Sequence, residues 1–205
     1  MQFLWRFTEL PFLIHLLKTK RLTLVSPKKW EDKNDRHYID IYQERKKLKT
    51  VLALCFTEKR ETYHHWKVFS GSMAGVSIAF YKHKLISWAK HHGLRYGSVE
   101  YYDYNKLRTM KLNIDKLPFI KRKAFEDERE FRFLYEEKKA VHDLMEFEIE
   151  LNFIKRIRVS PWLPESLVKS VKDTIKSIDG CKDLEVYRTT LLDNVSWKKA
   201  GGEIV

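Results

Sequence analysis

Six apolar residues stand together at positions 51–56, Val51-Leu52-Ala53-Leu54-Cys55-Phe56. Because no polar residue interrupts them, the pattern predicts a strand that is buried on both faces. Such a strand lies in the middle of a sheet. Shorter segments that are apolar, or that alternate with a period of two, predict the other strands, and they cover 2–7, 21–25, 75–80, 96–102, 131–135, 145–151, 154–159 and 184–187.

Few helices are predicted. One follows Thr8, which can cap it, a short one follows Thr62, and another covers 163–178. Many short strands with few helices are typical of an α+β fold with a mixed, largely antiparallel sheet. A length of 205 residues without a glycine-, proline- or serine-rich linker predicts a single domain over residues 1–205.

Composition narrows the class of protein. Hydrophobic residues make up 43% of the chain and charged residues 33%, which excludes a disordered or fibrous protein. Lysine and arginine (40) exceed aspartate and glutamate (28), so the formal net charge is +12. Such a surplus attracts nucleic acid, an anionic cofactor or an acidic protein partner, and charge alone does not choose among them.

Several classes of site are not expected. Two cysteines are too few for a disulfide framework, which indicates a reducing, cytoplasmic setting. No signal peptide and no membrane association are predicted, since no apolar run approaches the roughly 18 residues of a membrane span. The seven glycines form neither G-x-G-x-x-G nor a phosphate-binding loop. The pairs His64-His65 and His91-His92 lack a third ligand at suitable spacing, so no metal is expected.

The charged stretch at 121–133, Lys-Arg-Lys-Ala-Phe-Glu-Asp-Glu-Arg-Glu-Phe-Arg-Phe, is the most informative for chemistry. If a strand begins near Phe125, the side chains of Glu128, Glu130 and Arg132 lie on one face. Two carboxylates beside a guanidinium suit acid–base chemistry, because each group shifts the proton affinity of the others. The alternative is a solvated strand face with alternating charges.

Two further positions are candidates for a site. Arg6 is a charge within an apolar strand and must be paired or bind an anion, unless it lies on an edge strand and points to water. Thr57 ends the buried strand, where ligands often bind, although it can also be an ordinary capping residue. Tyr63 and Trp66 follow on the next predicted helix. Cys55, within the apolar run, is expected to be a core residue rather than a nucleophile.

A basic segment offers a different kind of site. Its cations can follow a phosphate backbone, although charge runs are often only solvated. The residues concerned are Arg45, Lys46, Lys47 and Lys49. Together with aromatic side chains expected to be exposed, such as Trp30 and Tyr38, they predict binding to single-stranded nucleic acid.

The order of these segments resembles a widespread bacterial family of unknown function. Its signatures are S-P-x-x-F-N-D-P, W-x-x-Y with G-[IV]-x-[IL]-x-F, and W-x-x-E-x-E-x-R. This sequence offers Ser26-Pro27-x-x-Trp30-x-Asp32, Trp66-x-x-Phe69 with Gly75-Val76-Ser77-Ile78-Ala79-Phe80, and Phe125-x-x-Glu128-x-Glu130-x-Arg132. The resemblance covers Leu4 to about Val186. Glu31, Lys33 and Phe125 replace the family's Asn, Pro and Trp.

The layout also resembles the ADP-ribosyltransferase superfamily. In that superfamily a first-strand Arg or His, a Ser, Thr or Tyr at a strand-to-helix junction, and a late-strand Glu line a cleft that holds NAD. Arg6, Thr57 and Glu130 stand at those places in that order. The resemblance implies that NAD is a substrate, that Glu130 stabilises positive charge on the ribose, and that Arg6 holds the ribose or phosphate.

The same resemblance implies supporting roles for other residues. Thr57 would contact the nicotinamide ribose or orient the glutamate, and Glu128 would accept a proton from the incoming nucleophile. Arg132 would tune the two carboxylates, and Tyr63 or Trp66 would stack on nicotinamide. Replacing the catalytic glutamate by glutamine is then expected to abolish NAD turnover and to leave stability nearly unchanged.

Three hypotheses follow from the sequence. The first is an NAD-dependent ADP-ribosyltransferase, a toxin or phage-defence effector that modifies RNA or DNA. The second is a basic nucleic-acid-binding domain without transferase activity. The third is a module that binds a protein partner, such as an acidic antitoxin or a regulatory protein.

Overall fold

The computed structural model of the chain describes residues 2–203. Its strands, in chain order, are β1 (Phe3–Glu9), β2 (Arg21–Val25), β3 (Thr50–Thr57), β4 (Gly75–Tyr81), β5 (Arg95–Ser98), β6 (Glu100–Tyr102), β7 (Ile120–Arg122), β8 (Glu130–Glu137), β9 (Leu144–Glu148), β10 (Ile154–Val159) and β11 (Glu185–Arg188).

Helices separate most of these strands, except β5 from β6 and β8 from β9. The α-helices are α1 (Leu10–Thr19), α2 (Lys33–Arg45), α3 (Tyr63–Ser70), α4 (Lys82–His91), α5 (Tyr104–Thr109), α6 (Glu165–Lys176) and α7 (Val195–Gly202). Short 3-10 helices are η1 (Pro27–Lys29), η2 (Ile114–Phe119), η3 (Lys123–Glu128) and η4 (Leu151–Phe153). None of the helices within residues 2–203 is long and apolar enough to cross a lipid bilayer.

The strands form a nine-stranded sheet in the order β11-β10-β4-β1-β3-β2-β9, with β8 paired to β3 and β5 paired to β8. Its pairs are antiparallel except for β10–β11, and β6 and β7 form a separate parallel pair. The predicted α+β fold with a mixed, largely antiparallel sheet is therefore confirmed.

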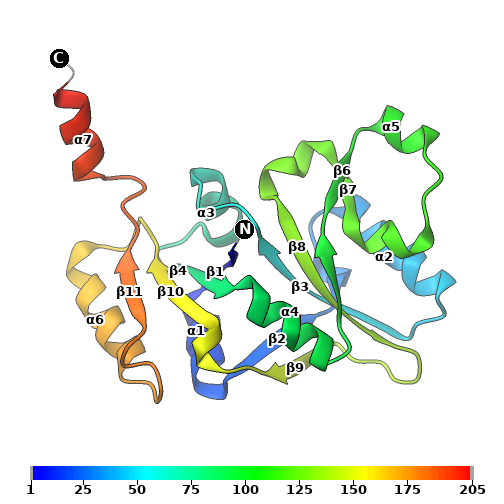
Figure 1. Cartoon of the computed structure of the whole chain (residues 1–205), viewed down its shortest axis with the longest axis horizontal. Coiled ribbons are helices and arrows are strands. Elements are labelled where there is room, and N and C mark those ends of the chain that lie inside the picture. The colour runs from blue at the N-terminus through cyan, green and yellow to red at the C-terminus, as the bar shows by residue number, and fades with distance from the viewer. Residues whose placement is uncertain (1, 204–205) are drawn as a thin grey trace.

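The central strand β3 decides the shape of the sheet (Figure 1). It pairs with β8 along its whole length, from Thr50↔Glu137 to Thr57↔Glu130. Two strands pair with the other edge of β3, each at a single position: β1 at Trp5↔Thr57 and β2 at Val25↔Ala53. The strands β1 and β3 therefore diverge beyond one contact, and the sheet opens there.

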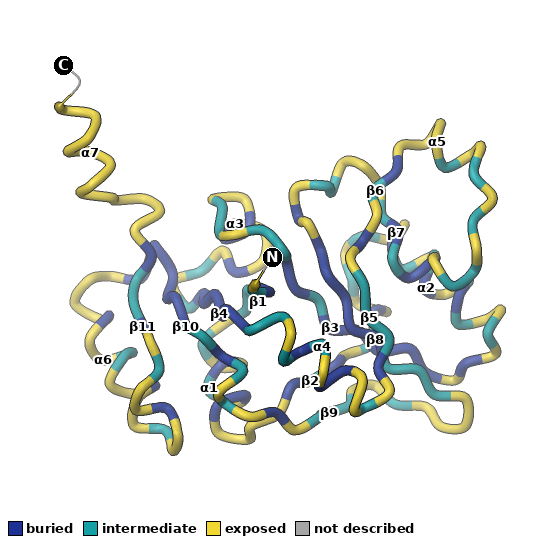
Figure 2. The backbone as a smooth tube through the Cα atoms, viewed as in Figure 1, coloured by how far each residue is buried: buried dark blue, intermediate teal, exposed yellow. Residues whose placement is uncertain are grey.

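Helices cover the sheet on both faces. On one side α1, α4 and α6 pack against the main core, which includes Leu13, Leu17 and Trp88. On the other side α2 packs against β3 with Ile39 and Tyr42, and residues 99–128 pack against α2. We call residues 99–128 the arm; it contains β6, α5, η2, β7 and η3. Figure 2 shows the buried centre of β3 and β8 and the exposed helices α5 and α7.

Several predicted boundaries are wrong. Thr8 lies in β1, and Glu9 is the residue before α1. The predicted strand at 96–102 is two strands in different sheets, because it turns at Val99. The helices α2, α4, α5 and α7 were not predicted; α4 follows β4 directly and lacks a capping side chain, so the sequence carries no start signal there.

The stretch before Phe131 is not a strand. Residues 123–128 form the 3-10 helix η3, and Arg129 adopts a left-handed backbone conformation with φ of 44°. The strand β8 begins only at Glu130. The predicted alternation therefore holds for Glu130 and Arg132 but not for Glu128.

Candidate functional site

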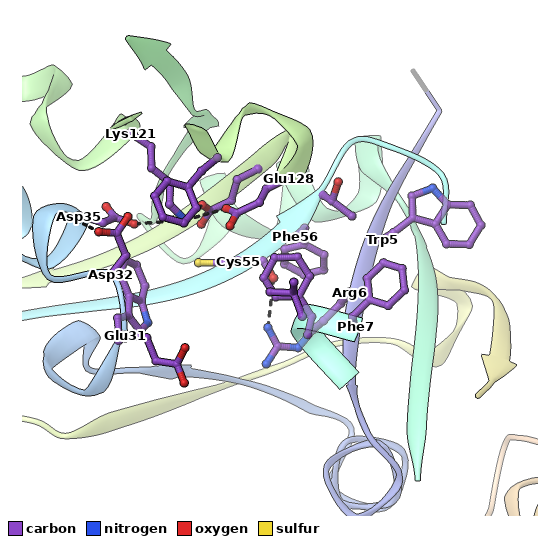
Figure 3. A pocket seen from close by; sticks show the side chains of 16 residues that line it. Trp5, Arg6, Phe7, Glu31, Asp32, Asp35, Cys55, Phe56, Lys121 and Glu128 are labelled. Carbon is purple, nitrogen blue, oxygen red and sulfur yellow. Dashed lines mark hydrogen bonds and ion pairs between the residues drawn. The ribbon is translucent and has the colours of Figure 1, made fainter. Parts of the chain in front are cut away.

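A pocket of about 410 Å³ lies where β1 and β3 diverge. Its lining includes Arg6 from β1, Thr57 from the end of β3, Glu128 from η3 and Glu130 from the start of β8. Figure 3 shows the side chains that surround it. The structure thus brings together the four residues for which the sequence predicts a catalytic role.

Arg6 spans the opening between the two strands. Its Nη1 donates a hydrogen bond to the carbonyl oxygen of Cys55 on β3, at 3.2 Å (Figure 3). The side chain is half-buried, and β1 has β4 on one side and β3 on the other, so the alternative of an edge-strand arginine is wrong. Burial lowers the pKa of Arg6, yet a guanidinium stays charged in proteins. No other side-chain hydrogen bond of Arg6 is found within residues 2–203, so its remaining N–H groups are available to a ligand.

Thr57 is the cross-strand partner of Glu130, so their side chains share a face of the sheet. Its Oγ1 accepts a hydrogen bond from the backbone N–H of Lys59 at 3.0 Å. This bond lies in the loop after β3, and Thr62 rather than Thr57 caps the next helix, α3. The hydroxyl hydrogen finds no acceptor among the described residues, which leaves Thr57 one donor for a ligand.

Glu130 is held by Arg132, two residues along the same face of β8. Nε of Arg132 lies 2.7 Å from Oε1 of Glu130, and Nη2 lies 2.8 Å from Oε2. Arg132 is fully buried and also donates to both carboxylate oxygens of Asp35 and to the carbonyl oxygen of Pro118. The alternative of a solvated strand face is therefore wrong.

The charge of Glu130 follows from these contacts. Burial alone would raise the pKa of Glu130, but the adjacent Arg132 and, to a lesser degree, Lys121 lower it to about 2. The carboxylate is therefore ionised at neutral pH. A carboxylate can accept about four hydrogen bonds, and Oε2 already accepts from both Arg132 and Lys121, so Oε1, which accepts only from Arg132, keeps a free lone pair.

Two members of the site were not found from the sequence. Lys121, on β7 in the arm, places Nζ 2.6 Å from Oε2 of Glu128, 3.5 Å from Oε2 of Glu130 and 3.8 Å from Oδ2 of Asp35. Asp35 lies in the first turn of α2 and is 2% exposed. We call Asp35, Lys121, Glu128, Glu130 and Arg132 the charged cluster.

Glu128 converges with Glu130 although it lies outside the strand. Its side chain is buried, and burial raises its pKa more than the neighbouring Lys121 lowers it. A carboxyl group with a raised pKa is suited to accept a proton near neutral pH. The two carboxylates therefore differ in proton affinity, because Arg132 stabilises the charge of only one of them directly.

Cys55 faces the same pocket from β3, opposite Arg132 in the strand register. Burial and the nearby Glu130 raise the pKa of the Cys55 thiol well above its usual value. A protonated thiol is a poor nucleophile, so Cys55 contributes a wall of the pocket rather than its chemistry.

The pocket is negative although the chain is positive. Five carboxylates stand in its lining against only two cations, Arg6 and Lys121. The five are Glu31, Asp32, Asp35, Glu128 and Glu130. The pocket therefore favours a ligand group that is cationic or becomes cationic during reaction. Within residues 2–203 no three or more acidic, histidine or cysteine side chains are arranged to hold a metal ion.

The structure does not bring Tyr63 and Trp66 to the pocket. Trp66 is fully buried, with its indole N–H donating to Glu61 at 2.9 Å. Tyr63 is 53% exposed and faces Trp162. The same helix, α3, instead lines the pocket with Val68 and Phe69.

The aromatic side chains expected to be exposed are half-buried. Trp30 lies over the guanidinium of Arg132, at 4.9 Å from the ring centroid, and lines the pocket. Tyr38 packs against the cluster around α2. The two rings are therefore not the exposed platforms that the sequence predicts.

The basic segment lies at the other end of the β3–β8 pair. The backbone N–H of Lys49 donates to the carbonyl oxygen of Glu137, the last residue of β8. The eight residues of that strand separate it from the pocket by about 24 Å, at about 3.4 Å per residue. Lys46 is paired with Asp115 at 2.6 Å, whereas Arg45, Lys47 and Lys49 are exposed. The predicted nucleic-acid segment is therefore not part of the pocket.

No model of a protein family matches the sequence, and no curated protein matches it. The resemblance to the bacterial family of unknown function therefore stays a prediction. Two solved structures are similar to this chain, both of DarT from Thermus sp. 2.9.

The two structures differ in what they contain. The one in complex with NAD+ is 11% identical, with a TM-score of 0.47, and the alignment covers 92% of this chain and 95% of that chain. The one in complex with ADP-ribosylated ssDNA is 10% identical, with a TM-score of 0.47 and coverages of 92% and 94%.

Proposed function

We propose that the pocket binds NAD and that the chain transfers ADP-ribose from it to a nucleic acid. The observation that carries this proposal is the convergence of Arg6, Thr57 and Glu130, from three distant parts of the chain, on one negative pocket. A guanidinium, a hydroxyl donor and an ionised carboxylate are the groups that this chemistry needs.

The central step is the rupture of the bond between nicotinamide and C1′ of its ribose. The electron pair of that bond leaves with the nicotinamide nitrogen, and positive charge builds on the sugar. Glu130 accepts a hydrogen bond from a ribose hydroxyl and stabilises that charge, because Arg132 keeps it ionised. The stabilisation grows as the charge develops, so it lowers the barrier rather than only tightening binding.

The acceptor completes the reaction. A nucleophilic atom of the acceptor attacks C1′ with its lone pair, and its proton passes to Glu128, whose raised pKa suits that role. Arg6 holds a ribose hydroxyl or a phosphate oxygen with its free N–H groups. Thr57 donates its hydroxyl hydrogen to the nicotinamide ribose. Arg132 is fully buried, so it acts only by positioning and charging Glu130.

The apolar wall of the pocket suits the nicotinamide ring. Phe69 on α3 and Phe125 on η3 line it, and these side chains take the stacking role that the sequence predicts for Tyr63 or Trp66. A flat cationic ring between aromatic and acidic groups is favoured both by contact area and by charge.

The experiment uses NAD labelled separately in the nicotinamide and in the adenylate. The protein is incubated with each form and with RNA, single-stranded DNA or a cell lysate. We expect release of labelled nicotinamide and transfer of adenylate label to a nucleic-acid fraction. No release of nicotinamide with any fraction would contradict the proposal, and label in protein alone would contradict its acceptor.

A toxin or phage-defence role would follow if transfer damages nucleic acid in a cell. Expression of the chain would then stop growth, and Glu130→Gln would relieve the arrest. An acidic antitoxin or regulatory protein is a partner that the +12 charge favours. Its test is co-purification of such a protein with the native chain at low salt.

Nucleic-acid binding without transfer is the second candidate. The observation in its favour is the net charge of +12, which lies largely outside the pocket. It predicts oligonucleotide binding that falls with salt and no release of nicotinamide from NAD.

A further inference from the structure

A second groove, of about 530 Å³, adjoins the pocket. Its lining includes Phe3 and Trp5 from β1, Lys59 and Arg60 from the loop after β3, and Arg156 from β10. Trp5 lines both the groove and the pocket, and it is the one residue of β1 that pairs with Thr57. The groove and the pocket are therefore neighbours that share the side chain of Trp5.

The groove has the opposite charge to the pocket. Three cations, Lys59, Arg60 and Arg156, stand in its lining with a single carboxylate, Glu58. The charge of Glu58 is offset by Lys82, whose Nζ lies 2.7 Å away.

The three cations of the groove are only weakly engaged by the protein itself. Arg60 is exposed and has no ion pair within residues 2–203. Lys59 lies 3.3 Å from Asp127, which is 82% exposed, and Arg156 lies 3.4 Å from Glu185, which is also exposed. Such loose surface pairs contribute little, so the cations can exchange them for phosphate oxygens.

Aromatic rings stand beside these cations. Phe3 is half-buried and packs against its cross-strand neighbour Tyr81, with ring centroids 5.3 Å apart, and against Trp5 at 6.3 Å. Phe3 and Trp5 lie two residues apart on one face of β1. Trp5 is only 4% exposed and the guanidinium of Arg158 lies 4.4 Å from its ring centroid, so Phe3 is the ring that a base can reach. Ala79 is the cross-strand partner of Trp5 on the neighbouring strand. The alanine leaves room beside the rings, since its side chain is small.

Aromatic faces beside a line of cations form the arrangement that binds single-stranded nucleic acid. Bases stack on the rings and the cations follow the phosphates, without a requirement for sequence. A duplex hides the faces of its bases, so it cannot use the rings. We propose that this groove binds a single-stranded stretch of nucleic acid and presents one nucleotide to the pocket.

The role of the groove in presenting an acceptor rests on the proposed function, whereas binding itself does not. The positive charge of the groove would also attract the diphosphate of NAD. The experiment must therefore distinguish the phosphates of a nucleic acid from those of NAD. The nucleic acid is the favoured occupant of the groove, because Arg6 lies in the pocket and can bind the diphosphate of NAD there.

The test measures the binding of a fluorescein-labelled single-stranded oligonucleotide, DNA or RNA, without NAD, over a series of salt concentrations. The groove variant is Lys59→Glu with Arg60→Glu. The control is Arg45→Glu with Lys49→Glu, which makes the same change of charge at exposed positions on the basic segment.

We expect the groove variant to lose at least tenfold in affinity. We also expect the slope of log affinity against log salt to fall by about 1.4, because each of the two cations that no longer neutralises a phosphate of a single strand lowers it by about 0.7. The control should keep the slope of the native protein. Phe3→Leu should weaken binding about tenfold and leave the slope unchanged, because it removes stacking and not charge.

Three results would overturn the inference. The first is an equal loss in the control, since binding would then follow overall charge. The second is an unchanged slope in the groove variant. The third is unchanged oligonucleotide binding with weakened NAD binding, which would assign the groove to the diphosphate of the donor.

Failure of the groove and failure of the proposed function are distinguishable. Oligonucleotide binding is measured without NAD, and release of nicotinamide is measured without an oligonucleotide, so either result stands without the other. If NAD is never cleaved, the groove variant still shows its loss of binding. If the groove is wrong, the release of nicotinamide is unaffected by that result.

Discussion

The two ends of the β3–β8 pair carry charge runs that look alike in the sequence but behave differently in the structure. At one end, Thr57 faces Glu130, and the charged cluster lies buried beneath α2 and the arm. At the other end, Thr50 faces Glu137, and Arg45, Lys47 and Lys49 are exposed to solvent. The same strands thus carry a site at one end and a solvated surface at the other.

The difference comes from what covers each end. In the arm, β7 packs against α2. Lys121 from β7 and Asp35 from α2 therefore both lie close to the start of β8. Buried charges interact strongly, because little water screens them, and they must pair. The exposed cations at the other end, Arg45, Lys47 and Lys49, have no such requirement, because water screens them. The charged residues therefore form a candidate site only where distant segments of the chain bury them together at one end of β8.

Loss of the central cation should have the largest effect. Arg132→Met leaves Asp35 and Glu130 buried without their partner, so the free energy of unfolding should fall by about 5 kcal/mol. Arg45→Met, at the solvated end, should change it by less than about 0.5 kcal/mol. Urea unfolding midpoints measure both. Similar losses in the two variants would refute the distinction between the ends.

Glu130→Gln should destabilise the protein as well as inactivate it. The sequence suggested nearly unchanged stability, but the structure shows Glu130 in a bidentate pair with the buried Arg132. Breaking that pair should cost about 3 kcal/mol. Glu137→Gln, on the same strand at its other end, should be close to neutral. Equal unfolding midpoints of Glu130→Gln and the native protein would show that the pair contributes nothing.

The pH dependence of this effect has a defined sign. The pKa of Glu130 in the folded protein is lowered to about 2, so its ionised form stabilises the protein above the ordinary carboxyl pKa. That contribution, about 3 kcal/mol for a shift of this size, should disappear as pH falls from about 4.5 to about 2. The stability difference between the native protein and Glu130→Gln should shrink over that range. A difference that stays constant would contradict the ionised pair.

Substitution of the threonines at the two ends of β3 should change stability least of all these variants. Only the substitution at the pocket end should reduce activity. Thr57→Val removes the acceptor for Lys59 N–H, so stability should fall by about 1 kcal/mol, and it removes the proposed donor to NAD. Thr50→Val removes a hydrogen bond to the carbonyl oxygen of Ala140 at the other end, with a similar loss of stability. Only the first should reduce nicotinamide release, by about tenfold. Thr57→Ser should restore it.

The fold was predictable where one signal dominated. The uninterrupted apolar run identified β3, and Thr62 identified the start of α3. The strand boundary before Glu130 was not predictable, because η3 packs against β6 and β7 and the carbonyl oxygen of Arg129 accepts a hydrogen bond from the backbone N–H of Glu58. Local patterns do not include such contacts.

The site was predictable only in part. The convergence of Arg6, Thr57 and Glu130 was predicted from the resemblance of their order to that in the ADP-ribosyltransferase superfamily, and not from their spacing. Asp35 carried a usable signal, since it precedes Ile39 and Tyr42 by four and seven residues and thus stands on the apolar face of α2. Lys121 carried none.

The strand that holds Lys121 has three residues and pairs only with β6, so neither length nor alternation marks it as part of a site. The placement of Tyr63 and Trp66 was missed for a related reason. Helical spacing puts both on one side of α3 but does not say what that side packs against, and Trp66 turns toward Phe7.

Release of nicotinamide from NAD by Glu130→Gln, compared with Glu137→Gln, tests the central claim most directly. Both variants remove one carboxylate from β8, and both are assayed at a temperature where their unfolding curves show a folded protein. We expect nicotinamide release to fall by about 10² to 10³-fold in Glu130→Gln and to be unchanged in Glu137→Gln. Release at the native rate by folded Glu130→Gln would contradict the claim that this pocket cleaves NAD.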